Sequence, residues 1–210
     1  IIADKIVIPE ENKQFYSEKV VYIQDCYMCF DDTREVSNIY PTRKELGLNN
    51  DSFVLTAFHN PSKITSKEFD CWAEILLKVE NSVLWVSKSN KEVELNLRSQ
   101  ISSRGISDNK LVFADKIASQ SQHLGRHLCG DIFVDTFKYN AHSTAIDSLW
   151  AGLPVLTLIG NYFSSRVCAS LLKTLHLEEL IASNEREYIQ KAIELANNPD
   201  KLEKIKNKLK

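Results

Sequence analysis

Short runs of apolar residues, rich in β-branched and aromatic side chains, alternate along this sequence with longer stretches of helical periodicity. The runs that predict strands are residues 20–23, 53–58, 83–86, 111–113, 132–135 and 154–158. Continuous apolar runs, without apolar–polar alternation, are typical of parallel strands that are buried on both faces of a sheet. The order therefore predicts an α/β fold, a Rossmann-like parallel sheet with helices on both faces.

The stretches between these runs carry apolar residues three and four positions apart, as one buried face of a helix requires. Phe69, Trp72 and Leu76 form the clearest example, and further stretches cover residues 93–101, 120–129, 146–150, 167–175 and 188–196. The residues before 51 do not share this rhythm. We therefore predict a connecting region (1–50), a Rossmann-like domain (51–181) and C-terminal helices (182–210).

The charges of the chain nearly cancel, because 26 Lys and Arg stand against 28 Asp and Glu, for a formal net charge of −2. This balance argues against a nucleic-acid partner. No apolar stretch approaches the roughly 18 residues that a membrane span needs, which argues against a membrane protein. The odd count of five Cys does not suggest a disulfide framework. With no secretory leader before Asp4, we expect a cytoplasmic protein, and we interpret the chain as a piece of a longer one.

Ligands of open α/β sheets bind beyond the carboxyl ends of the strands, so the loops after the predicted strands are the first candidates for a site. A helix that begins near Ser143 or Thr144 would direct free amides and hydroxyls toward a phosphate. The alternative is that Thr144 and Asp147 only form a capping box. Lys63, in the loop after an earlier strand, either neutralises a diphosphate or is simply solvated. Neither GxGxxG nor GxxxxGKS/T occurs in the sequence.

Two patterns raise the question of a metal site. His123 and His127 have the spacing of metal ligands on one helical face, but the Glu of HExxH is missing and no third ligand is evident. Cys26 and Cys29 form a lone CxxC without a second pair. We therefore predict no metal.

Longer motifs follow one another along nearly the whole chain. Residues 123–127, 131–136 and 139–154 read HLGRH, DIFVDT and YNAHSTAIDSLWAGLP, and shorter segments of the same set lie at 2–5, 16–19, 82–85 and 165–170. This ordered set resembles the carboxyl-terminal catalytic half of the O-linked N-acetylglucosamine transferase and SPINDLY family. The resemblance implies one half of a GT-B glycosyltransferase, with residues 51–181 as its nucleotide-sugar-binding domain.

For function, the resemblance implies an inverting enzyme that transfers N-acetylglucosamine, or a related sugar, to Ser or Thr hydroxyls of proteins. The donor substrate would be UDP-N-acetylglucosamine or a related nucleotide sugar, and no cofactor is implied. Tetratricopeptide repeats upstream of this chain would present the protein acceptor. The general base of the family lies in the amino-terminal half, so we expect this fragment alone to be inactive and to bind UDP weakly.

The resemblance also assigns roles to individual residues. It places Asn60, Lys63, Ser143 and Thr144 on the donor diphosphate, with Lys63 as the catalytic residue that stabilises the leaving UDP. His142 would lie beside the sugar and the diphosphate. Around the nucleoside, it places Ala118, His123 and Arg126 on the base, with His123 stacked on it, Asp147 on the ribose, and Gln120 near the ribose.

Three residues depart from the family pattern. Asn60 stands where the animal transferases have Gln, Gln120 stands where they have Lys, and Tyr139 replaces a small residue near the sugar. The donor sugar is therefore less certain than the nucleotide. Alternatives are a SPINDLY-like protein O-fucosyltransferase, a degenerate scaffold module without enzyme activity, and a transferase that acts on a lipid or a small sugar.

Overall fold

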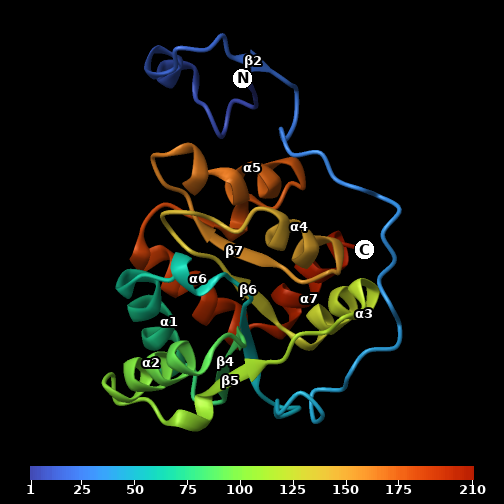
Figure 1. The fold of residues 1–210 in the computed structure, drawn as a ribbon, viewed down its shortest axis with the longest axis vertical. Helices are drawn as coiled ribbons and strands as arrows, with labels where there is room; N and C mark the ends of the chain where they lie inside the picture. The colour runs from blue at the N-terminus through green and yellow to red at the C-terminus, as the bar shows by residue number, and fades with distance from the viewer.

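A six-stranded sheet forms the centre of the computed structural model, which describes all 210 residues (Figure 1). Its strand order is β5-β4-β3-β6-β7-β8, and every neighbouring pair is parallel. The strands are β3 (Phe53–Ala57), β4 (Ser82–Ser87), β5 (Leu111–Ala114), β6 (Ile132–Val134), β7 (Val155–Leu158) and β8 (Ile181–Ala182). From β3 the chain first moves outward to β5, then returns to β6 and moves outward in the other direction. The predicted parallel sheet is confirmed, and its order reverses between β3 and β6.

Seven α-helices accompany the strands. They are α1 (Ser66–Lys78), α2 (Lys91–Ser102), α3 (Gln120–Gly125), α4 (Ser143–Trp150), α5 (Val167–Thr174), α6 (Glu185–Asn197) and α7 (Pro199–Lys208). Helix α1 packs on α6, and α3 packs beside α4. None of the helices combines the length and the apolar character that a membrane span requires.

One apolar core joins the sheet to its helices. It contains 41 buried residues, and the largest of them include Trp72 of α1, Trp85 of β4 and Tyr188 of α6. The Trp72 indole N–H donates to the Tyr188 hydroxyl (3.2 Å), which in turn donates to the Asp135 carbonyl oxygen at the end of β6 (3.2 Å). The expected boundary between residues 181 and 182 falls inside β8, and the helices after it add buried residues to the same core.

The first residues form a separate lobe. Strands β1 (Ile2–Ala3) and β2 (Val21–Tyr22) pair in a two-stranded parallel sheet, so the strand predicted at 20–23 lies outside the main sheet. Figure 1 shows this lobe at one end of the molecule, next to α5. Buried Asp4 ties the two together, because its carboxylate accepts from the Ser170 hydroxyl of α5 (2.7 Å) and from the Tyr27 amide (3.0 Å).

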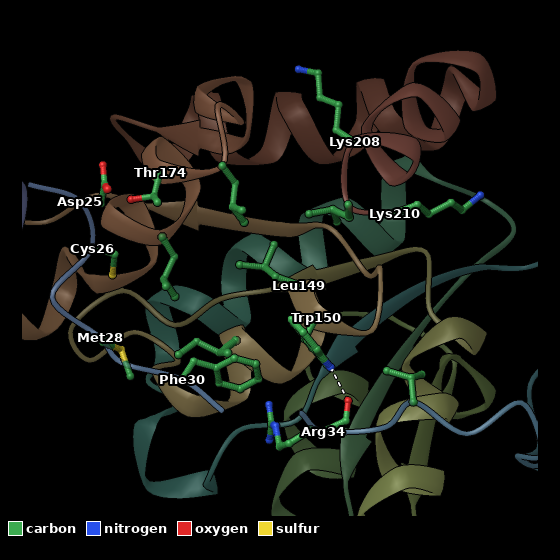
Figure 2. A pocket seen from close by; sticks show the side chains of 15 residues that line it. Asp25, Cys26, Met28, Phe30, Arg34, Leu149, Trp150, Thr174, Lys208 and Lys210 are labelled. Atoms are coloured by element: carbon green, nitrogen blue, oxygen red, sulfur yellow. Dashed lines mark hydrogen bonds between the residues drawn. The ribbon is translucent and has the colours of Figure 1, made fainter. Parts of the chain in front are cut away.

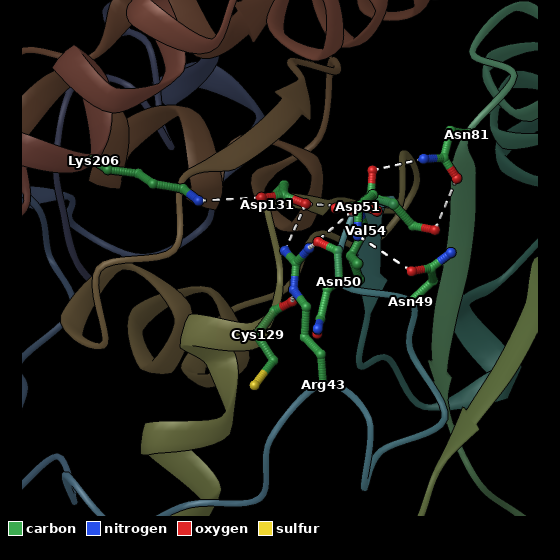
Figure 3. Close-up of polar contacts among 10 residues, drawn as sticks. Arg43, Asn49, Asn50, Asp51, Val54, Asn81, Cys129, Asp131 and Lys206 are labelled. Carbon is green, nitrogen blue, oxygen red and sulfur yellow. Dashed lines mark hydrogen bonds and ion pairs between the residues drawn. The ribbon is translucent and has the colours of Figure 1, made fainter.

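From this lobe, residues 25–50 run down one side of the molecule to β3 (Figure 1). Arg43 anchors the end of the run at the amino ends of the strands. Its Nη1 donates to the carbonyl oxygens of Asn50 and Ser52 (2.9 Å each), its Nε to Cys129 O (3.0 Å) and its Nη2 to Asp131 Oδ2 (2.8 Å; Figure 3). All three nitrogens of the guanidinium therefore have partners. We call this end of the sheet the amino edge and the opposite end the carboxyl edge.

The helix predicted over 120–129 differs from the structure in its second half. Helix α3 ends at Gly125, and Arg126–Cys129 continue as a 3-10 helix. A Cβ at Gly125 would come within 2.5 Å of Ser37 O, so the approach of the connecting region requires glycine there. A 3-10 helix has three residues per turn, which rotates later side chains away from the α-helical stripe. Leu128, predicted to lie beside buried Leu124, is accordingly exposed.

Candidate functional site

Two polar loops meet at the carboxyl edge, where the strand order reverses. The first follows β3 and contains a 3-10 helix (Pro61–Lys63), and the second, which we call the site loop, comprises residues 136–142 after β6. The Lys63 ammonium donates to the Asn140 carbonyl oxygen (3.1 Å) and lies 4.1 Å from the centroid of the Tyr139 ring. Crevices at such reversal points are the usual ligand sites of α/β sheets.

Lys63 is half-buried rather than freely solvated. Burial lowers the pKa of its ammonium, and the negative charge of Asp135 opposes that effect. Its neighbour Asn60 is exposed, and the Asn60 side-chain oxygen accepts from the amide (3.1 Å) and the hydroxyl (3.0 Å) of Ser62. In this structure Asn60 caps the short helix that carries Lys63.

The start of α4 lies at the end of the site loop. His142 occupies the N-cap position and makes no capping hydrogen bond through its side chain, and Ser143 and Thr144 are the first two residues of the helix. The capping-box alternative for Thr144 and Asp147 is therefore wrong, because Thr144 lies inside the helix. The Asp147 carboxylate instead forms an ion pair with Arg34 (Nη1 to Oδ1, 2.7 Å). No side chain of the chain caps the first amides of α4, which suits them to an anion.

His142, the last residue of the site loop, lies against the short 3-10 helix Phe163–Ser165. Its ring stacks on Tyr139, with centroids 4.7 Å apart and planes 20° apart, and its Nε2 lies 3.4 Å from Ser164 O. Burial lowers the pKa of His142, and the charge of Lys63 adds to that effect. His142, Tyr139 and Lys63 thus form one contiguous group.

Two buried carboxylates hold the site loop in place. Asp135 Oδ1 accepts from the amides of Thr136 (2.8 Å) and Ala141 (2.7 Å), and its Oδ2 accepts from the Thr157 hydroxyl (2.6 Å). Burial raises the pKa of Asp135 to about 6. Glu68, in the first turn of α1, accepts from the Phe137 amide (2.8 Å). Lys63 and the start of α4 are therefore connected through fixed backbone.

A second group lies beyond the ends of β3 and β4. The Arg126 guanidinium is buried, lies 4.5 Å from the Phe58 ring centroid and 5.9 Å from that of Trp85, and donates from Nη1 to Asp115 O (2.5 Å). Its Nε is buried without a partner. Burial lowers the pKa of Arg126 to about 10.

His123 lies near Phe58, which also contacts Arg126. Its ring centroid lies 6.3 Å from that of Phe58, and burial lowers its pKa, with further electrostatic effects from Arg126, Asp147 and Arg34. These four charged or titratable groups therefore share one neighbourhood. Ala118 and Gln120 are exposed, in the loop before α3 and at its first residue.

The two histidines of the HLGRH motif contact each other rather than a common ion. His127 Nδ1 hydrogen-bonds to His123 O (2.9 Å), the rings meet edge to face with centroids 5.0 Å apart, and burial lowers the pKa of His127 to about 3. Its Nε2 is buried without a partner. No group of three or more His, Cys, Asp or Glu side chains is placed to hold a metal ion.

Arg34 is the site residue that the sequence analysis missed. It belongs to the connecting region, stacks over the Phe30 ring (4.0 Å) and reaches Asp147 of α4 across 113 positions of the chain. Its Nε and Nη2 are buried without hydrogen-bond partners. No periodic pattern surrounds Arg34, so only the tertiary structure reveals this contact.

A mainly apolar cavity lies beside α4. It has a volume of about 660 Å³ and is lined mainly by apolar residues of the connecting region, α4 and α5 and by the last residues of the chain (Figure 2). Arg34 and Trp150 are among its lining residues, and none of the predicted site residues lines it.

The fold matches solved glycosyltransferases. The chain superposes on an O-GlcNAc transferase mutant from Thermobaculum terrenum with a TM-score of 0.89 and 24% identity, covering 99% of this chain and 39% of that one. Likeness at a TM-score of 0.54 extends to a UDP-GlcNAc 2-epimerase from Neisseria meningitidis, at 14% identity over 77% of this chain and 40% of that one. The sheet, its reversal point and its helices are those of one half of a GT-B glycosyltransferase.

The sequence comparison narrows this class to a family. The profile described as "Glycosyl transferase family 41" matches residues 32–210, and the chain belongs to that family. The probable UDP-N-acetylglucosamine–peptide N-acetylglucosaminyltransferases SEC and SPINDLY of Arabidopsis thaliana are 31% and 30% identical over the whole chain. The chain spans 22% of the first relative and 23% of the second.

Proposed function

We propose that this chain is the UDP-sugar-binding half of an inverting glycosyltransferase, which transfers N-acetylglucosamine or a related sugar to Ser or Thr hydroxyls of proteins. The contact between Lys63 and the site loop carries this proposal, because it brings a cation to the uncapped start of α4 at the reversal point. The names of the SEC and SPINDLY relatives support the choice of donor and acceptor.

In the proposed reaction, the acceptor hydroxyl oxygen forms a bond to the anomeric carbon while the bond from that carbon to the UDP oxygen breaks. Negative charge grows on the diphosphate, and fixed donors aimed at that charge stabilise the transition state. Lys63 and the amides of Ser143 and Thr144 supply those donors. The hydroxyl proton goes to a base in the amino-terminal half, outside this chain, so the fragment alone is inactive and binds UDP weakly.

The remaining predicted residues hold the nucleoside and the sugar. His123 stacks on the base beside Arg126 and Ala118, Asp147 accepts from the ribose hydroxyls, and Gln120 lies at the ribose. His142 and Asn60 lie along the sugar and the diphosphate. Burial lowers the pKa of His123, which favours the neutral imidazole.

The setting of the proposed enzyme follows from the same family. The acceptor protein is presented by tetratricopeptide repeats upstream, and the reaction takes place in the cytoplasm. Within the chain, residues 1–50 lead from the amino-terminal half, and the sheet that begins after them binds the nucleotide sugar.

A SPINDLY-like O-fucosyltransferase is the second candidate. Tyr139 leaves the donor sugar open, because its ring lies against Lys63 and His142, where the sugar is expected. Incubation of the full-length protein with a UDP-N-acetylglucosamine or a fucose nucleotide, each carrying a labelled sugar, separates the two candidates by which label reaches protein. If neither donor is hydrolysed or transferred, the chain is a scaffold module instead.

Calorimetry with UDP on the full-length protein tests the phosphate site. We expect Lys63→Ala to weaken UDP binding by about 1.5–3 kcal/mol, the range for hydrogen bonds to charged groups. Lys67→Ala is the matched control, because Lys67 is an exposed lysine of α1 that pairs with Glu185 (3.3 Å). Unchanged UDP affinity in Lys63→Ala would contradict the assignment of Lys63.

A further inference from the structure

Arg34 reaches the candidate site from a part of the chain with no assigned role in it. Its Nη1 lies 2.7 Å from Asp147 Oδ1, and only 16% of the Arg34 side chain and 20% of the Asp147 side chain are exposed. The ion pair is therefore largely shielded from water, where screening is weak. Asp147 is the residue expected to receive the ribose of the nucleotide.

The surroundings hold the backbone of Arg34 close to α4. The Trp150 indole N–H donates to the Arg34 carbonyl oxygen (3.0 Å; Figure 2), and Trp150 lies three residues after Asp147 on the same helix. Phe30 contacts both partners, with its ring 4.0 Å from the Arg34 guanidinium and 5.2 Å from the Trp150 ring centroid. The guanidinium is thus placed by aromatic contacts, while its charge meets Asp147.

The guanidinium of Arg34 has hydrogen-bonding capacity that the chain does not use. Its Nε and Nη2 are buried and unpartnered, whereas buried donors in proteins are nearly always paired. Arg43 shows the contrast, since every nitrogen of its guanidinium donates to backbone or to Asp131. Arg34 is therefore tied to the protein through Asp147 rather than through a backbone network.

We propose that Arg34 is a positioning residue of the donor site, which orients the Asp147 carboxylate toward the ribose hydroxyls of a nucleoside diphosphate. This inference rests on the proposed function. Asp147 Oδ1 faces Arg34, and the second carboxylate oxygen is left for a hydroxyl donor. The positive charge of Arg34 also offsets the repulsion between Asp147 and the nearby diphosphate.

The same pair links the connecting region to the site. Arg34 belongs to residues 25–50 and pairs with Asp147 of α4. A ligand that binds Asp147 in this position would therefore also hold residues 25–50 against the helix. The segment runs along the side of the molecule in Figure 1, and its last part is anchored independently by Arg43. A substitution at Arg34 should therefore affect the site without releasing the segment.

A double-mutant cycle in the full-length protein tests the inference. We expect Arg34→Ala to weaken UDP binding and to raise KM for the UDP-sugar by roughly tenfold, with kcat changed less than about twofold, because the binding is lost equally from ground state and transition state. In Asp147→Ala, the further change Arg34→Ala should have no additional effect on UDP affinity. Arg34→Lys, which keeps the charge, should recover part of the affinity.

The matched control is Arg98→Ala, which breaks an exposed Arg–Asp pair on α2 (2.5 Å to Asp108) and should leave UDP affinity unchanged. Melting temperatures of all variants show whether each one folds. If Arg34→Ala does not fold, Arg34→Lys provides the test instead. Unchanged UDP affinity in Arg34→Ala would overturn the role of Arg34 but not the proposed function. So would a double variant in which the fold-losses of UDP affinity from Arg34→Ala and Asp147→Ala multiply. Failure of the unmodified protein to bind UDP would overturn the proposed function with it.

Discussion

Two Arg–Asp pairs join the connecting region to the rest of the fold, one at the amino ends of the strands and the other on helix α4. Arg43 and Asp131 at the amino edge belong to a network in which every guanidinium nitrogen and the Val54 amide have partners (Figure 3). Arg34 and Asp147 at the carboxyl edge share one ion pair, and two Arg34 nitrogens are unpartnered. The same pair of residue types is thus fully hydrogen-bonded at one edge and only partly so at the other.

The distribution of unpartnered polar atoms supports this contrast. Six buried side-chain nitrogen or oxygen atoms lack a hydrogen-bond partner, and four of them belong to Arg34, Arg126 and His127. Asp131, by comparison, also pairs with Lys206 of α7 (3.4 Å). We propose that the paired groups around Arg43 stabilise the amino edge, and that the unpartnered groups of Arg34, Arg126 and His127 belong to a binding site.

The largest expected effect concerns the amino edge. Arg43→Ala leaves Asp131 without its main partner and removes three hydrogen bonds to carbonyl oxygens. Removing one member of a largely buried pair costs about 3 kcal/mol, so we expect a loss of that order in the free energy of unfolding. Chemical denaturation of the chain measures it, with Arg98→Ala as the exposed control. A loss below about 1 kcal/mol would remove the distinction between the two edges.

The next effect concerns buried histidine at the carboxyl edge. Burial lowers the pKa of His59 to about 4, and its Nε2 hydrogen-bonds to Val134 O (2.8 Å). The unfolded pKa is near 6.5, so the stabilisation is complete above that pH and is lost as pH falls toward 4. Between pH 7 and pH 5, the loss of this stabilisation amounts to about 2 kcal/mol in the free energy of unfolding. Chemical denaturation at both pH values measures this loss. We expect the stability of His59→Gln to fall by about 2 kcal/mol less than that of the unmodified chain. Equal losses in the two chains would contradict protonation of His59 as the cause.

The smallest effect concerns the contact between the Tyr139 ring and Lys63. Tyr139 is about half exposed (46%), and its ring lies 4.1 Å from the Lys63 ammonium. We expect Tyr139→Leu to lower the free energy of unfolding by about 0.5–1 kcal/mol, while Tyr139→Phe, which keeps the ring, is neutral. Thermal unfolding of the two variants measures the difference. Equal stability of both would show that the ring does not hold Lys63.

The sheet could be predicted because its strands are continuous apolar runs, and strand order determines which loops meet. Lys63 follows β3 and the start of α4 follows β6. These two strands are neighbours in the sheet, so the topology brings the two loops together. The short strands β1 and β8 lack such a signal. Leu128 was placed wrongly, because the α-helix ends at Gly125 and Arg126–Cys129 form a 3-10 helix.

Arg34 and the cap of α4 lay beyond sequence reasoning for a different reason. The pattern Thr144-x-x-Asp147 matches a capping box, and only the position of Arg34 shows where the carboxylate goes instead. Arg34 stands in a polar segment without periodicity, so nothing local predicts its partner. The roles assigned to the donor-binding residues stay predictions until a nucleotide is bound.

The most direct test of the contrast between the edges is an amide NMR titration of the 210-residue chain with UDP. We predict shifts at Lys63, in the site loop, at Ser143 and Thr144 and near His123 and Arg126, with the amides around Arg43 and Asp131 unchanged even if binding is weak. Shifts confined to the amino edge or to the cavity of Figure 2 would contradict the account.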